Sequence, residues 1–168
     1  NVLKLVRDWL VVQTGAVNED ARGIEIKNEL MGEGVRFVAA HEVGHAIGLP
    51  HNMGSSSAYP VDSLRSATFT KKYGTAPSIM DYARYNYVAQ PEDKGVALIP
   101  SDWDTPNSGI YDRFSVKWGY KPILGSSQDE EKEILRKWII ENQDDLKYRF
   151  GPGNRICLLY TSDAADDR

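Results

Sequence analysis

The chain has 168 residues, of which 41% are hydrophobic and 26% are charged, and its formal net charge is −4. This length and balance are typical of one globular domain with a hydrophobic core. The net negative charge and the scattered lysines and arginines give no indication of a binding surface for nucleic acid. No apolar run approaches the ~20 residues of a membrane span. A single cysteine, Cys157, excludes an intramolecular disulfide.

Two helices are predicted in the first third of the chain. Residues 2–13 place apolar side chains at helical spacing, and a polar stretch with glycines follows at 14–23. Residues 28–47 are helical again, and Gly48 is placed to end this second helix in a left-handed conformation. Pro50 then prevents the helix from resuming. The expected stripe along one face of the second helix comprises Leu30, Met31, Val35, Val38, Glu42 and Ala46.

The remainder of the chain is predicted to form a loop region and two more helices. Residues 52–78 are rich in Ser, Gly, Pro and Thr, which favours irregular structure. The segment IYDRFSVKWGY predicts a helix around residues 111–118, with Phe114 and Trp118 facing inward. An S-x-x-E capping box at residues 127–130 opens the last helix. One side of that helix is expected to carry Ile134, Leu135, Trp138 and Ile139.

The end of the chain is expected to lie outside the fold. A Gly-Pro-Gly sequence at 151–153 ends the ordered pattern. The last letters, CLLYTSDAADDR, resemble a string that recurs at the ends of unrelated metagenomic translations. Residues 151–168 are therefore predicted to be disordered or non-native sequence.

All three histidines of the chain fall within eleven residues, in HEVGHAIGLPH. His41 and His45 are four apart on a predicted helix, so their rings project from one face and can present two nitrogens to one Zn²⁺. Glu42 is rotated about 100° away, too far round to be a neighbouring ligand but close enough to reach a water at the metal. This is the H-E-x-x-H arrangement of metalloproteases.

The residues that follow decide between a zinc site and two histidines on an ordinary helix. Gly48 lets the backbone turn sharply, and His51 comes three residues later, where it can reach the metal from the other side. Three neutral imidazoles and an open position make a catalytic rather than a closed structural zinc site. The sequence therefore predicts one catalytic Zn²⁺ held by His41, His45 and His51.

The full H-E-x-x-H-x-x-G-x-x-H segment resembles the signature of the metzincins, zinc metalloproteases that also carry a methionine turn, the Met-turn. Met80, in Ser78-Ile79-Met80-Asp81-Tyr82, lies 29 residues after His51 and matches that methionine. The resemblance implies that Met80 forms an apolar floor beneath the zinc, for which an unbranched thioether is suited. The alternative role for Met80 is that of an ordinary core residue.

Tyr82 matches the S-x-M-x-Y pattern of the astacin and serralysin branches of the metzincins. The resemblance implies that Tyr82 contacts zinc or stabilises the oxyanion; the alternative is a half-buried core tyrosine. Asn52, directly after His51, differs from the acidic or small residues of the best-known branches.

The stretch 28–122 is also similar to a poorly characterised group of large bacterial zinc-dependent metalloproteases, which are usually exported and carry further domains. This resemblance implies a longer multidomain chain and an extracytoplasmic location, whether periplasmic, at the cell surface or secreted.

The expected fold class is α+β, predominantly helical in this fragment. The resemblance implies a metzincin-like catalytic domain with a zinc helix, a Met-turn and C-terminal helices. Only 27 residues precede the zinc helix, so we expect the N-terminal sheet to be truncated. Residues 1–150 would form this partial domain, with 1–51 as its upper part, including the zinc helix, and 52–150 as its lower part.

These features predict an endopeptidase that hydrolyses peptide or protein substrates through a metal-activated water. Glu42 would be the general base, and Tyr82 would donate a hydrogen bond to the oxyanion. The alternative function is a non-catalytic, zinc-stabilised binding or scaffold module. Truncation of the sheet favours that alternative, because the edge strand would bind the substrate, whereas Glu42 favours the enzyme.

Overall fold

The computed structural model describes residues 8, 11–12, 14–15, 17–23, 27–83, 85–98 and 107–152. These residues form helices, turns and loops and include no β-strand, so the prediction of a predominantly helical fragment is confirmed over this part of the chain. The predicted helix over 2–13 lies largely outside the described residues, and truncation of the sheet stays a prediction. The elements are η1 (Glu19–Ala21), α2 (Asn28–Ala46), η2 (Ser55–Ser57), α3 (Val61–Leu64), α4 (Ala67–Tyr73), α5 (Ile110–Tyr120), α6 (Gln128–Asn142) and η3 (Leu146–Tyr148), where η marks a 3₁₀ helix.

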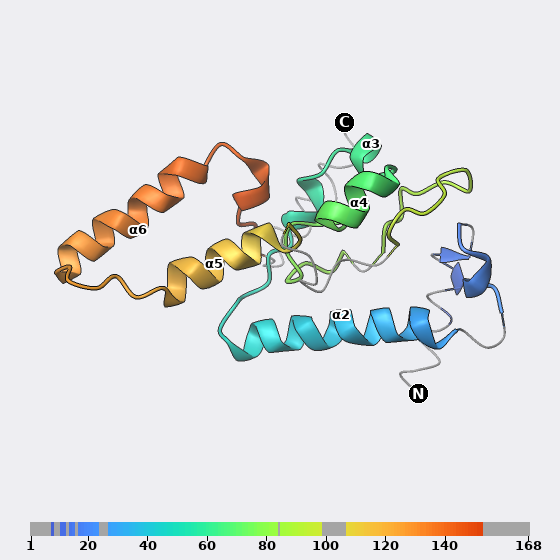
Figure 1. The fold of residues 1–168 in the computed structure, drawn as a ribbon, viewed down its shortest axis with the longest axis horizontal. Helices are drawn as coiled ribbons and strands as arrows, with labels where there is room; N and C mark the ends of the chain where they lie inside the picture. Colours follow the sequence, from blue (N-terminus) through green and yellow to red (C-terminus); the bar gives the residue numbers. More distant parts are fainter. Residues whose placement is uncertain are drawn as a thin grey trace.

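The helices surround a central region of loops (Figure 1). Helix α2 runs along one edge of the molecule, and α3 and α4 pack together on the opposite side of those loops. Helices α5 and α6 extend from one end as a hairpin. The Lys117 ammonium lies 4.4 Å from the centre of the Trp138 ring and joins the two. Among the described residues, none of the helices has the length and apolar character that crossing a bilayer requires.

Helix α2 ends in a Schellman motif. Gly48 has a φ of +88°, in the left-handed region, and its N–H donates to the His45 carbonyl over 2.9 Å. The next residue, Leu49, donates its N–H to the Gly44 carbonyl over 2.9 Å. These two bonds define the motif and satisfy carbonyls that the end of a helix leaves without partners. The chain therefore turns sharply between the second histidine and the third.

The buried face of α2 matches the predicted stripe at Leu30 and Met31, which belong to the core or pack against it, and differs from the stripe further along the helix. Its buried residues are Leu30, Phe37, His41 and Gly44, whereas Val35 and Val38 are 58% and 53% exposed. The prediction placed the valines inward because it weighted apolar character. The helix instead buries the face that carries a ligand histidine, because that face packs against the turn around Met80.

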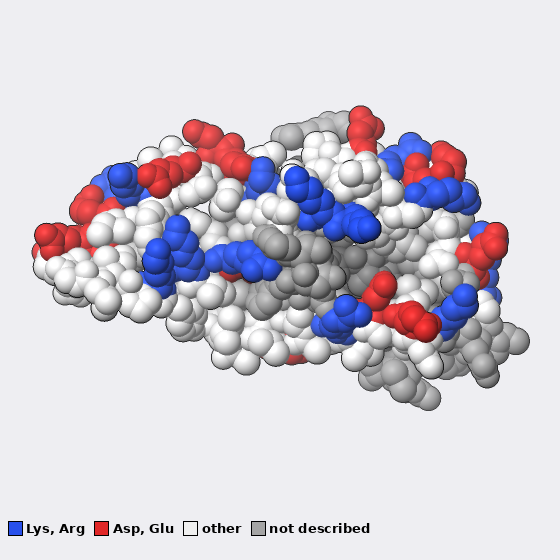
Figure 2. All heavy atoms as spheres, viewed as in Figure 1, with Lys and Arg blue, Asp and Glu red and all other residues white. Residues whose placement is uncertain are grey.

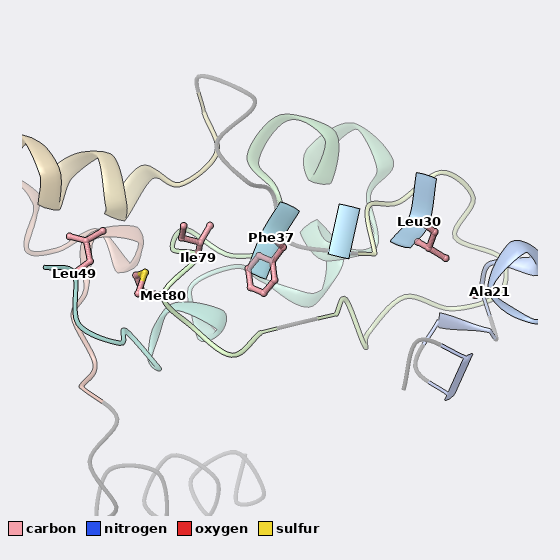
Figure 3. Close-up of a cluster of buried hydrophobic side chains, with 6 residues drawn as sticks. All are labelled: Ala21, Leu30, Phe37, Leu49, Ile79 and Met80. Carbon is pink, nitrogen blue, oxygen red and sulfur yellow. The ribbon is translucent and has the colours of Figure 1, made fainter. Parts of the chain in front are cut away.

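The main core cluster joins segments that are distant in sequence (Figure 3). Leu49, Ile79 and Met80 gather at one end with Phe37 of α2, and the cluster continues towards the start of that helix. The full cluster is Ala21, Leu30, Phe37, Leu49, Ile79 and Met80. The core is therefore densest where the chain turns after α2 and meets the methionine turn.

The prediction of irregular structure over 52–78 was wrong for α3 and α4. The Ser66 hydroxyl caps α4 by accepting the Phe69 N–H over 3.3 Å, and Gly74, with a φ of +72°, ends it. Serine, proline and glycine act here as boundaries of short helices, so a composition typical of loops concealed them.

The two predicted C-terminal helices are present. In the predicted capping box of α6, the Ser127 N–H donates to the Glu130 carboxylate over 2.7 Å, and the Glu130 N–H donates to the Ser127 hydroxyl over 3.4 Å. The inward orientation of Trp118 was wrong, because it is 42% exposed, whereas Phe114 is half-buried against Tyr148. The apolar side of α6 is only partly covered, because none of its residues is buried.

The charged side chains of the described residues are intermixed on the face shown in Figure 2. On α6, Lys132 lies 3.2 Å from Asp129 and Lys137 lies 3.9 Å from Glu141. Such exposed pairs within a helix stabilise it by only about 0.3–0.5 kcal/mol each. The α6 surface is therefore suited to solvent and contributes little to the stability of the core.

Candidate metal centre

The three histidines converge on one point although they come from two different local structures. His41 and His45 lie on α2, one turn apart, and His51 lies beyond the Schellman motif. One ring nitrogen from each lies within 4.8 Å of the other two. The centroids of the three rings are 4.6–5.3 Å apart. The His45 and His51 Nε2 atoms are 3.0 Å apart.

Backbone carbonyls fix the tautomers of the two helical histidines. His41 Nδ1 lies 2.6 Å from the Ile79 carbonyl oxygen, and His45 Nδ1 lies 2.9 Å from the Leu49 carbonyl oxygen. A carbonyl only accepts hydrogen bonds, so Nδ1 carries the proton in both rings. The Nε2 lone pairs are then left to bind a metal, and the carbonyls hold the rings in orientation.

This donor set fits Zn²⁺. Tetrahedral zinc with Zn–N bonds of 2.0–2.1 Å separates its nitrogen ligands by about 3.3–3.4 Å. The 3.0 Å between the His45 and His51 Nε2 atoms is close to that separation, and the nitrogen of His41 lies within 4.8 Å of both. Burial and the neighbouring rings of His45 and His41 lower the pKa of His51, while the nearby carboxylate of Glu42 raises it. The net lowering favours the neutral imidazole, which is the form that binds a metal.

A buried carboxylate on α5 holds the turn that supports His41. Asp112 is fully buried; its Oδ1 accepts the Ser78 hydroxyl over 2.5 Å, and its Oδ2 accepts the Ile79 N–H over 2.8 Å. The Met80 N–H donates to the same Ser78 hydroxyl over 3.0 Å. The carbonyl of Ile79 is therefore held in place by Asp112 and in turn orients His41. Sequence reasoning missed Asp112, because an acid in the first turn of a helix reads as an ordinary capping charge.

Met80 packs against the metal-binding helix through a glycine. Met80 is 1% exposed, and a Cβ added to Gly44 would lie 2.4 Å from its sulfur. Gly44 lies three residues after His41, on the same face of α2. Sequence reasoning missed Gly44 as well, because it is one of the two unrestricted positions in H-E-x-x-H.

Tyr82 and Glu42 lie at the same site as the histidines. The Tyr82 ring is centred 4.7 Å from that of His51 and 5.8 Å from that of His41, and the residue is 51% exposed. Glu42 is exposed on α2, and its charge acts on His51. The structure therefore brings the three histidines together and places Tyr82 beside two of them, whereas the catalytic role of Glu42 stays a prediction.

Comparison with protein families agrees with this geometry. A family model described as Met-zincin matches residues 23–166, more than half of the chain. The chain belongs to the Met-zincin family and, with its three converging histidines, is a zinc metalloprotease-type domain. Searches of curated proteins and of solved structures found no match. The matched range overlaps the segment 151–168; its residues 153–168 lie outside the described residues, so their expected disorder or non-native origin stays a prediction.

Proposed function

We propose that the chain is a zinc-dependent endopeptidase in which His41, His45 and His51 hold one Zn²⁺ and Glu42 is the general base. The observation that carries the proposal is the convergence of three imidazoles, two of them with their Nδ1 hydrogens committed to backbone carbonyls. A site that only stabilises a fold needs four protein ligands, whereas three leave room for a substrate.

The chemistry that Zn²⁺ supplies when bound is that of a Lewis acid, which acidifies water and polarises a peptide carbonyl. Glu42 accepts a proton from the attacking water and delivers it to the amine that leaves. The Tyr82 phenol donates a hydrogen bond to the carbonyl oxygen as negative charge develops there. Met80 forms the apolar floor of the site, and Gly48 supplies the turn that brings His51 to the other two ligands.

Replacement of Glu42 tests the general base. Glu42→Gln is expected to abolish peptide hydrolysis while zinc content, measured by metal analysis, stays near one per chain. Glu33→Gln, an exposed substitution on the same helix, is the matched control and should leave turnover unchanged. Retained hydrolysis in the Glu42 variant would contradict the assignment.

Replacement of Tyr82 tests the oxyanion donor. Removing a preorganised donor lowers kcat by roughly 10²–10³-fold, so Tyr82→Phe should lower kcat by that order and leave zinc content unchanged. Tyr87→Phe, at a 75% exposed tyrosine nearby, is the control. Unchanged turnover in Tyr82→Phe would remove this residue from the mechanism.

The second candidate function is a zinc-stabilised binding or scaffold module. One observation favours it: the described residues include no β-strand to which a peptide substrate could add. Titration with a hydroxamate distinguishes the two functions. Tight hydroxamate binding without hydrolysis of any peptide in a diverse pool would favour the module, and turnover that titrates with the hydroxamate would favour the enzyme.

A further inference from the structure

Asn52, the residue after the third histidine, is fully buried and uses three polar groups to join distant segments. Its backbone N–H donates to the Met80 carbonyl over 2.9 Å. Its side-chain Nδ2 donates to the Arg149 carbonyl over 3.1 Å, and its Oδ1 accepts the Gly151 N–H over 2.8 Å. Residues 149–151, here called the strap, are thus bonded to a position nearly one hundred residues earlier.

A backbone contact between two glycines brings the strap this close. The Gly54 N–H donates to the Gly151 carbonyl over 3.3 Å. A Cβ added to Gly151 would lie 2.8 Å from Gly54 Cα and 2.9 Å from Gly54 N. Backbone atoms cannot swing aside as a flexible side chain can, so a side chain at position 151 would push the strap away from Asn52.

The support of His51 differs from that of the other two ligands. His41 and His45 lie on α2, so the helix fixes their backbone. His51 lies beyond the end of the helix, and its position depends on the chain on either side of it. The Schellman motif fixes that chain on one side, and the hydrogen bonds of Asn52 fix it on the other.

We propose that Asn52 is a positioning residue that makes the strap part of the metal centre, by holding the backbone that carries His51. This inference rests on the proposed zinc site and adds the strap to it. The nearest strap residue, Arg149, lies 98 residues after His51 in the sequence. Docking of the strap and binding of zinc then stabilise each other, because linkage between two sites is reciprocal.

The test measures zinc affinity in the full chain by competition with a chromogenic chelator. Partners that orient a metal ligand typically change metal affinity by 10- to 100-fold. Asn52→Ala is therefore expected to weaken zinc binding by at least about 10-fold. Gly151→Ala, which alters neither a ligand nor Asn52, should weaken it in the same direction.

The matched control is Asn86, a second buried asparagine whose Nδ2 donates to the Leu64 and Ala97 carbonyls over 2.8 and 3.0 Å. Neither of these partners is a ligand or a residue of the strap. Asn86→Ala should lower the thermal midpoint of the metal-free chain and leave zinc affinity within about twofold. Loss of affinity in the Asn86 variant as large as in the Asn52 variant would reduce Asn52 to a general contribution to stability and overturn the proposal.

Amide hydrogen exchange in the wild-type chain gives a test that survives if a variant fails to fold. Zinc should slow exchange of the Gly151 N–H, which is bonded to Asn52. The role of the strap would be overturned if zinc did not change the exchange rate at Gly151, or if the Asn52 and Gly151 variants bound zinc as tightly as the wild type. Either result would still be compatible with the zinc site itself. A wild-type chain that binds no zinc would instead overturn the proposed function itself.

Discussion

Replacing Gly44 with alanine sets two opposite effects against each other. In the interior of a helix, alanine is favoured over glycine by about 1 kcal/mol. At Gly44, however, the new methyl group would lie 2.4 Å from the sulfur of Met80, which is 1% exposed. Forcing an extra methyl group into a well-packed core costs about 1–3 kcal/mol, so the packing cost equals or exceeds the gain in helix propensity.

Two glycines on the same helix serve as controls for the propensity effect. A Cβ added to Gly32 or Gly34 meets nothing within 4 Å. Gly32→Ala and Gly34→Ala should therefore each stabilise the chain by up to about 1 kcal/mol. Gly44→Ala should be less stable than either control by about 1–3 kcal/mol, the packing cost alone.

The assay is urea unfolding followed by circular dichroism, with chelator present so that zinc contributes nothing. The Gly44→Ala substitution should be tested again in a Met80→Ala background, where the clash is removed and the alanine should become neutral or stabilising. A Gly44→Ala variant as stable as Gly34→Ala, with Met80 in place, would refute the reasoning.

Three further predictions concern the turn, a surface ion pair and the metal. Asp112→Asn replaces one acceptor and leaves a donor from Ser78 or Ile79 unpaired, which should lower the urea-unfolding free energy by about 1–3 kcal/mol; an unchanged value would contradict it. Hydrogen bonding to the Arg65 guanidinium lowers the pKa of Asp93. Above pH ~4 the wild type should therefore unfold at a higher urea concentration than Asp93→Asn, and this difference in urea midpoint should disappear as the pH falls further. A difference independent of pH would exclude this pair as its cause. Free zinc at 100 times its Kd should stabilise the chain by about 2.7 kcal/mol and raise Tm, and equal Tm values with zinc and with chelator would contradict the site.

The features that could be predicted from the sequence are the local ones. Helix α2 and its Gly48 terminus follow from residues a few positions apart, and so does the pairing of His41 with His45. The capping box at Ser127 is equally local. The short helices α3 and α4 escaped prediction because a helix of four to seven residues has too few turns to show a repeating pattern of apolar residues. The serine, proline and glycine at their ends then dominate the local composition.

The features that escaped prediction depend on contacts between distant segments. Gly44 matters because Met80 packs against it, and Asp112 matters because it holds Ile79, 33 residues earlier in the chain. Neither contact can be inferred from the spacing of residues in the sequence, because the tertiary fold determines which distant residues meet. The inward face of α2 was misjudged for the same reason, because the position of the methionine turn, rather than the valines, decides which side is buried.

The support of the three ligands reaches progressively further along the chain. The carbonyl that holds His45 is four residues away, the one that holds His41 is 38 residues away, and Asn52, next to His51, is held by partners 97 and 99 residues away. Closing a longer loop costs more conformational entropy, so the hydrogen bonds that hold Asn52 are the most costly of the three supports to form. Two ligands therefore depend on one helix and its neighbouring turn, whereas the third depends on the end of the described chain. For this reason zinc affinity, more than helix content, reports whether the whole domain is folded.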